Sequence, residues 1–324
     1  MSATPPDAPR LPQRERRRGP IITTIVVAAV VVIAVIATLI LVNRPGGGSG
    51  PAAAGSSSGA TDRTVTIGIA DISQPYWKTF ADLAKQQLGV TVKYVNFTDY
   101  SQPNPALRQK QLDLNEFQHL QYLANYNVTS GDDLQPIGAT AIYPLPLYSS
   151  KYDSPSKLPA KAKVAIPNDA VNEARGLLVL QSAGLLTLKG GGTAFSTSKD
   201  IESAKIEVQP IDASQTATAV KNGSVAAAIV NKNYAVDAKL PKDQIIAQDD
   251  PSSAGAQPYV NAFVARKADA KDPVLLKLAA LYHTASVTDE VQKENGGSAV
   301  FETWSPAKLQ QILAKVETDA KAAK

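Results

Sequence analysis

The stretch of sequence that decides the fold begins Asn96-Phe97-Thr98-Asp99-Tyr100 and ends Phe117-Gln118-His119-Leu120-Gln121-Tyr122-Leu123. A strand-like run over residues 90–97 ends in this polar turn, and a helix-like segment follows it. Phe117, His119 and Tyr122 lie within six residues, in a chain with nineteen aromatic residues and two histidines. Open α/β sheets bind small ligands beyond the carboxyl ends of their strands, so the cluster predicts a pocket wall. The alternative is that these rings belong to the core, with a hydrogen-bonded histidine beside them.

The composition indicates a folded body and excludes several classes of site. The 324 residues are 44% hydrophobic and 19% charged, which is enough for two ordinary domains. The absence of cysteine excludes disulfides, thiolate metal sites, a cysteine nucleophile and a lipid-modified cysteine. The net charge of +4 comes from the arginine-rich first 20 residues and from Arg44, which leaves the rest of the chain neutral. A neutral body gives no electrostatic reason to expect a nucleic-acid partner.

An uncharged apolar run at residues 21–42 predicts a transmembrane helix. At about 1.5 Å per residue it would extend roughly 33 Å, close to a bilayer core of about 30 Å. The arginines that precede it predict a cytoplasmic tail at 1–20 and an external body. Residues 43–62 are rich in Gly, Ser and Pro and predict a flexible linker. The alternative is a cleaved signal peptide ending near Ala54, but the apolar run is longer than signal peptides use.

The body predicts an α/β fold, because strand-like and helix-like patterns alternate along it. The expected strands are 64–70, 90–95, 113–115, 163–167, 206–211 and 226–230. The expected helices are 77–88, 104–111, 119–127, 172–183, 214–222, 273–286 and 306–322.

Two extended stretches, 141–148 and 259–266, are expected to cross between lobes. The first carries two prolines, which a central strand does not tolerate, so it is expected as an edge or crossover strand. The predicted domains are a first lobe of residues 63–142 and 265–324 and a second lobe of 143–264. A cleft between such lobes is a preferred place for a ligand.

Polar side chains beyond the strand ends suit an amino-acid ligand. Arg175 follows Asn172 by three residues, so both project from one helix face, and a guanidinium binds both oxygens of a carboxylate. Tyr100 could join the ring cluster in lining an apolar slot with polar tips. Asn231 and Asn233 flank a strand end and offer amide oxygens. The alternatives are a solvated helix arginine for Arg175 and a plain turn for the two asparagines.

Patterns of catalysis and cofactor binding are missing from the sequence. It contains neither a Gly-x-Ser-x-Gly elbow nor a phosphate-binding glycine loop that leads from a strand into a helix. The two histidines, His119 and His283, lie far apart, and cysteine is lacking, which argues against zinc. We therefore expect no metal and no cofactor, and an enzyme is the weakest interpretation.

Five segments, in this order, resemble the methionine-binding lipoprotein family of the NlpA or MetQ type. They cover roughly residues 63–302 and read Phe97-Thr98-Asp99-Tyr100-x-x-Pro103-Asn104-x-Ala106-Leu107, Leu112-Asp113-x-Asn115-x-Phe117-Gln118-His119-x-x-Tyr122-Leu123, Val164-Ala165-Ile166-Pro167-Asn168-Asp169-x-x-Asn172-x-x-Arg175, Ala228-Ile229-Val230-Asn231-x-Asn233-Tyr234-Ala235 and Tyr259-x-Asn261. Members of that family are the substrate-binding components of methionine ABC importers.

The resemblance implies a two-lobed periplasmic-binding-protein fold of type II that closes on methionine and presents it to a permease driven by an ATPase. Residues Tyr100, Phe117, His119 and Tyr122 would then surround the ligand side chain. Arg175 would hold the carboxylate with help from Asn172, and Asn231 together with Asn233 would contact the amino-acid head group. We also expect Arg175→Ala to abolish binding while leaving the unliganded melting temperature nearly unchanged.

Three departures from the family pattern stand out. No cysteine is present for acylation, so the apolar run would have to anchor the chain. Lys232 stands where the family commonly has glycine between two asparagines, and the loop over 190–198 is enlarged. The alternatives left open are another small amino acid or a dipeptide as cargo, and a surface interaction protein that has lost its ligand.

Overall fold

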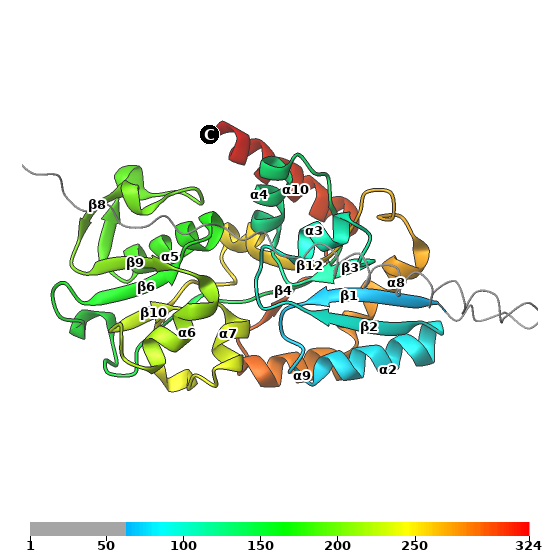
Figure 1. Ribbon diagram of the computed structural model, residues 1–324, viewed down its shortest axis with the longest axis horizontal. Coiled ribbons are helices and arrows are strands. Elements are labelled where there is room, and N and C mark those ends of the chain that lie inside the picture. The colour runs from blue at the N-terminus through cyan, green and yellow to red at the C-terminus, as the bar shows by residue number, and fades with distance from the viewer. Residues whose placement is uncertain (1–62, 324) are drawn as a thin grey trace, which may run out of the picture. The chain divides into compact units, whose positions relative to one another are not determined.

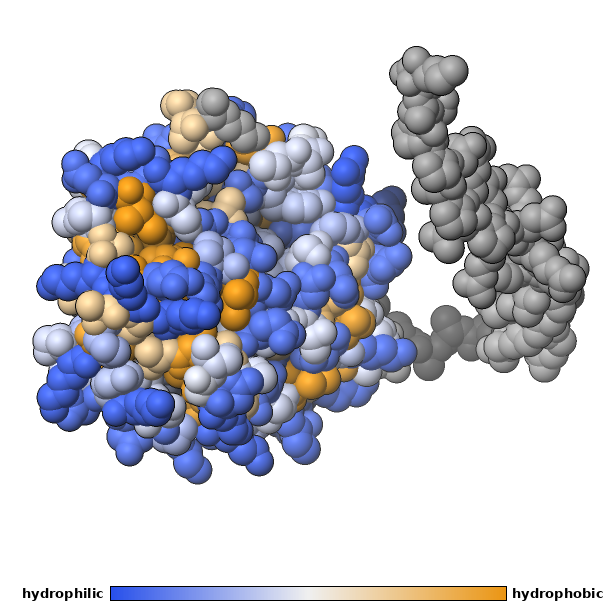
Figure 2. Space-filling view, turned by 60° about the vertical axis from the view of Figure 1, so that its left-hand side comes forward, coloured by the Kyte–Doolittle hydropathy of each residue, from blue (hydrophilic) through white to orange (hydrophobic). Residues whose placement is uncertain are grey.

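A computed structural model describes residues 63–323, which form two lobes, each built around one sheet (Figure 1). The predicted tail, transmembrane helix and linker, at 1–20, 21–42 and 43–62, lie outside the described residues. No helix within 63–323 is both long and apolar enough to cross a bilayer. The face in Figure 2 is mostly hydrophilic, with small separate apolar patches. Most large apolar side chains of the body are buried in its cores.

The first lobe has a six-stranded sheet with helices on both faces. Its strand order is β13 (Val300–Phe301), β4 (Gln135–Ile142), β12 (Val260–Ala265), β3 (Leu114–Glu116), β1 (Thr64–Ile69) and β2 (Thr91–Asn96). One face carries α2 (Tyr76–Leu88), α8 (Pro273–Ala280) and α9 (Ala285–Asn295), and the other carries α3 (Pro103–Arg108), α4 (Leu120–Ser130) and α10 (Pro306–Ala322) (Figure 1). Alternate residues of β12 enter the two cores, with Phe263 on one side and Val264 on the other.

The second lobe has a five-stranded sheet, again between helices. Its order is β11 (Ile245–Gln248), β5 (Pro146–Tyr148), β10 (Ala227–Ile229), β6 (Lys163–Pro167) and β9 (Glu207–Ile211). On one face lies α5 (Ala170–Ser182), and on the other lie α6 (Ala213–Lys221) and α7 (Lys232–Asp237). A hairpin of β7 (Leu186–Leu188) and β8 (Ile201–Ala204) extends this lobe, and the sequence patterns did not predict it.

The chain passes between the lobes twice, at residues 143–145 and within 249–259. The predicted stretch 141–148 therefore divides into the end of β4, a crossing with Pro144 and the short strand β5, which begins at Pro146. The predicted range of the second lobe, 143–264, is wrong at its end, because it includes most of β12. That strand pairs with β3 and β4, so its buried residues belong to the sheet of the first lobe.

Candidate ligand-binding cleft

One cavity between the lobes, called the cleft below, brings together all eight residues predicted to bind a ligand. Its empty volume is about 730 Å³, including the part that opens to solvent. The predicted residues on its wall are Tyr100, Phe117, His119, Tyr122, Asn172, Arg175, Asn231 and Asn233. Strands β1, β3, β6 and β10 end at this cleft, since the residues after each of them line it. That each of the eight contacts a ligand stays a prediction.

Three rings of the first lobe form an apolar slot in the cleft. The ring centroids of Tyr100, Phe117 and Tyr122 lie 5.9–6.2 Å from one another. Tyr234 of the second lobe adds a fourth ring, 5.1 Å from Tyr100. Rings at these separations contact one another directly and leave their edges and faces to a ligand side chain.

His119 joins this slot as a neutral side chain. It is the N-cap of α4, and its Nδ1 accepts a hydrogen bond of 3.2 Å from the backbone N–H of Tyr122. The accepting nitrogen carries no proton, so the other ring nitrogen, Nε2, carries it. Burial, together with the positive charge of Arg175, lowers the pKa of His119 to about 3. The imidazole is therefore uncharged at neutral pH and suits an apolar ligand group.

Arg175 is a buried cation that is already partly bonded. Its Nε donates to Asp249 Oδ2 at 2.6 Å, and its Nη2 donates to the Tyr143 carbonyl at 2.8 Å. Its guanidinium carbon lies 4.2 Å from the centroid of the Tyr259 ring. A guanidinium has five N–H groups, so three remain for a ligand carboxylate in the cleft.

These contacts contradict one expectation about Arg175. The side chain is only 5% exposed, and its removal would leave Asp249 Oδ2 and the Tyr143 carbonyl without this donor, while Asp249 Oδ1 would keep the backbone N–H of Leu145. A buried polar group that loses its partner costs roughly 1–3 kcal/mol of stability. The unliganded melting temperature of Arg175→Ala should therefore fall, contrary to the expectation from sequence.

A chain of amides leads from Asp169 into the cleft. Asp169 caps α5 and accepts from the backbone N–H and the Nδ2 of Asn172, each at 3.0 Å. Burial raises the pKa of Asp169, while these donors from Asn172 lower it. Because Asn172 turns its Nδ2 toward the carboxylate, its Oδ1 is left to accept Asn231 Nδ2 at 2.9 Å. Asn231 Oδ1 then remains a buried acceptor without any hydrogen bond among the described residues.

Asn233 differs from Asn231, because both of its amide atoms already join the lobes. Its Oδ1 accepts from the Tyr100 hydroxyl, and its Nδ2 donates to the Ala70 carbonyl at 3.3 Å. Beside it, the Tyr234 hydroxyl donates to the Thr98 carbonyl at 3.0 Å. Asn233 thus lines the cleft while holding α7 against the first lobe.

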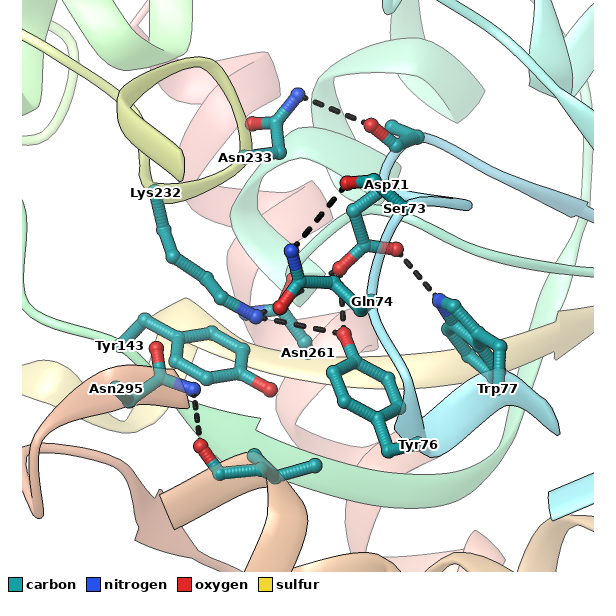
Figure 3. Close-up of polar contacts among 12 residues, drawn as sticks. Asp71, Ser73, Gln74, Tyr76, Trp77, Tyr143, Lys232, Asn233, Asn261 and Asn295 are labelled. Carbon is teal, nitrogen blue, oxygen red and sulfur yellow. Dashed lines mark hydrogen bonds and ion pairs between the residues drawn. The ribbon is translucent and has the colours of Figure 1, made fainter. Parts of the chain in front are cut away.

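The sequence patterns missed a charged part of the cleft, shown in Figure 3. Lys232 reaches across from α7, and its Nζ lies 3.6 Å from Asp71 Oδ2 and 3.4 Å from the Tyr76 hydroxyl. The same Nζ lies 4.5 Å from the centroid of the Tyr143 ring. Glu116 also lines this region. The replacement of glycine by Lys232 was the only visible signal.

Comparison with known proteins identifies the family. A model described as NlpA lipoprotein matches residues 65–304. The chain belongs to this family. The predicted resemblance is therefore confirmed, and with it the two-lobed α/β fold and the interpretation as a binding protein rather than an enzyme.

Individual proteins of known name resemble this chain in sequence and in structure. A D-methionine-binding lipoprotein MetQ from Salmonella typhi is 35% identical over 222 residues, which are 67% of this chain and 80% of that protein. The substrate-binding protein of a methionine transporter from Streptococcus pneumoniae has a TM-score of 0.69 at 35% identity, covering 74% of this chain and 96% of that one. A nutrient-binding protein from Burkholderia cenocepacia bound to methionine has a TM-score of 0.68 at 35% identity, covering 74% and 99%.

Proposed function

We propose that this chain is the extracytoplasmic solute-binding protein of an ABC importer and that its ligand is methionine or a close derivative. The observation that carries the proposal is the unpaired acceptor of Asn231, which lines the same cleft as Arg175 and the ring slot. A buried acceptor without a donor is costly, and an ammonium from a ligand would satisfy it. The cleft therefore lacks a hydrogen-bond donor for Asn231 Oδ1, and the ammonium of an α-amino acid would supply one.

The three parts of methionine match three parts of the cleft. The free N–H groups of Arg175 suit the carboxylate, and Asn231 Oδ1 suits the ammonium. The slot of Tyr100, Phe117 and Tyr122 suits the thioether, because sulfur interacts favourably with ring edges at about 5 Å. Neutral His119 lies beside them and brings no charge to the slot. The relatives that bind methionine support this assignment.

The partners and the location follow from the same role. We propose a permease and its ATPase as partners, since an importer's binding protein delivers its ligand to them. The apolar run at 21–42 would anchor the chain by a single span, with the body outside the cytoplasm, because no cysteine is available for a lipid. The arginines before the run favour this orientation.

A ligand screen tests the proposal. The full chain, purified in detergent, is heated with each amino acid, with D-methionine and with methionine dipeptides, and its melting temperature is measured. Ligand at 100 times Kd adds about 2.7 kcal/mol of stability, which is easily detected. Stabilisation by L- or D-methionine supports the proposal. Stabilisation only by an unrelated amino acid would reassign the cargo, and no stabilisation by any compound would favour an interaction protein that has lost its ligand.

A further inference from the structure

One end of the cleft is already built to hold an ammonium group. The carboxylate of Asp71, the carboxyl group of Glu116 and two tyrosines, Tyr76 and Tyr143, line it and are called the cation site below. Lys232 Nζ lies among them, 3.6 Å from Asp71 Oδ2, 4.5 Å from the Tyr143 ring centroid and 5.3 Å from that of Tyr76. Carboxylate oxygens and the faces of aromatic rings both attract an ammonium group.

The cation site is held in place without help from Lys232. Asp71 Oδ1 accepts from Trp77 Nε1 at 2.7 Å, and its Oδ2 accepts from the Tyr76 hydroxyl. Glu116 Oε1 accepts from the Thr140 hydroxyl at 2.8 Å. The acceptors would therefore keep their positions if the lysine ammonium were removed, and they would be free to take an ammonium from elsewhere.

An anionic ligand group does not suit this end of the cleft. Lys232 is the one cation on the described wall besides Arg175, and Asp71 already pairs with it. An anion would meet Lys232 only at the cost of approaching the Asp71 carboxylate, whose Oδ2 lies 3.6 Å from the lysine ammonium. The site is thus made for a positive charge, and Lys232 supplies that charge from within the chain.

The rest of the cleft indicates which ligand would need this place. If methionine binds as proposed above, its carboxylate lies at Arg175, its side chain lies in the ring slot and its nitrogen lies at Asn231. A residue added at that nitrogen moves the terminal ammonium onward by up to about 3.6 Å, the length of one extended residue. The remaining lining of the cavity includes the cation site and Lys232, the residue directly after Asn231.

We infer that Lys232 restricts the cleft to free amino acids, because its ammonium occupies the site that the terminal ammonium of a methionine dipeptide would need. The inference rests on the proposed function. It adds that Lys232 is a specificity-determining residue and that Asp71 is its counterpart on the first lobe. A small residue at position 232 would leave the cation site open to a dipeptide.

Isothermal titration of the full chain in detergent with three compounds tests this inference. They are methionine, glycylmethionine and N-acetylmethionine, which has nearly the length of the dipeptide but no ammonium. The measured quantity is the ratio of the Kd for each extended compound to the Kd for methionine. This ratio cancels changes in lobe closure that affect all ligands alike. Two variants are used, Lys232→Ala and Lys232→Ser, so that one misfolded protein does not end the test. The matched control is Lys239→Ala, which changes an exposed lysine two residues after the end of α7.

The parent chain should prefer methionine to glycylmethionine. Lys232→Ala should lower the glycylmethionine ratio by about 10- to 150-fold, the range for one hydrogen bond to a charged group. Addition of Asp71→Asn should reverse most of that gain, and Lys239→Ala should leave the ratio as in the parent. The N-acetylmethionine ratio should change much less.

Three results would overturn the inference while leaving the proposed function intact. They are equal binding of methionine and glycylmethionine by the parent, no gain in either Lys232 variant, and an equal gain for N-acetylmethionine, which would mean that Lys232 excludes by bulk alone. Failure of the parent chain to bind methionine would instead refute the proposed function itself.

Discussion

Glu116 gives the sharpest test of the electrostatics in the cleft. Its side chain is 7% exposed, and burial, with a further contribution from the charge of Asp71, raises its pKa to about 7. The Thr140 hydroxyl and Lys232 oppose this rise. The folded chain therefore holds a proton on Glu116 that an unfolded chain, with a pKa near 4.5, releases much earlier.

The sign and size of the effect follow from this difference. Stability due to the protonated Glu116 is fully present below about pH 4.5 and is lost as the pH rises through 7. The difference between a pKa of 4.5 and a pKa of about 7, at roughly 1.4 kcal/mol per pKa unit, amounts to about 3 kcal/mol. His119 acts in the opposite direction, because its pKa falls from 6.5 to about 3 and its stability contribution is lost as the pH drops. Between pH 4.5 and 6.5 the two slopes largely cancel in the parent chain.

Glu116→Gln separates the two contributions. The amide keeps the shape of the side chain and an oxygen for Thr140, but it does not titrate. We expect the free energy of unfolding of the variant, minus that of the parent, to rise by about 3 kcal/mol from pH 4.5 to 7.5. Urea titrations at half-unit pH steps measure this difference. In Thr140→Val, the loss of a bond that lowers the pKa should move the parent's transition to higher pH. A difference between Glu116→Gln and parent that stays flat across this range would refute the argument.

Three further predictions concern the ligand groups. Arg175→Ala should abolish methionine binding in calorimetry and also lower the unliganded stability by roughly 1–3 kcal/mol; an unchanged melting temperature would contradict the bonds to Asp249 and Tyr143. Asn231→Ala should weaken methionine binding by about 10- to 150-fold through loss of a charged hydrogen bond. An unaltered Kd would show that the ammonium does not bind at Asn231. Norleucine, in which a methylene replaces the sulfur, should bind about 2- to 10-fold more weakly than methionine if sulfur–ring contacts contribute about 0.3–1.5 kcal/mol. Equal affinities would show that the ring slot selects the ligand side chain by size alone.

The convergence of the eight predicted residues could be read from the sequence because it depends on local order. Tyr100 and Phe117 follow strands β2 and β3, Arg175 lies on the helix after β6, and Asn231 follows β10. In both sheets these strands run parallel to a neighbour, so their carboxyl ends lie on one edge. Two such edges that face each other bring the residues to one cleft.

Long-range contacts could not be predicted in the same way. β12 reads as an extended crossing, since nothing in its own sequence says that β3 and β4 flank it. The carboxylate that pairs with Arg175 is 74 residues away, in a crossing segment without a regular pattern. Lys232 and Asp71 come from different lobes, so their pairing depends on how the lobes meet rather than on the periodicity of either segment.

The most informative feature of the cleft, the unpaired oxygen of Asn231, shows why composition alone does not identify a ligand. An amide offers a donor and an acceptor, and the sequence does not say which one faces the ligand. Here Asp169 decides which amide atom faces the cleft. Its carboxylate accepts from Asn172 Nδ2, so Asn172 Oδ1 accepts from Asn231 Nδ2, and Asn231 Oδ1 is left as a free acceptor. If Asp169→Asn allowed either amide to reverse, Asn231 could present a donor instead. We therefore expect the proposed preference for an ammonium to depend on Asp169, which lies two hydrogen bonds away from the Asn231 side chain. Methionine affinity in Asp169→Asn, measured beside Asn231→Ala, would show whether that orientation matters.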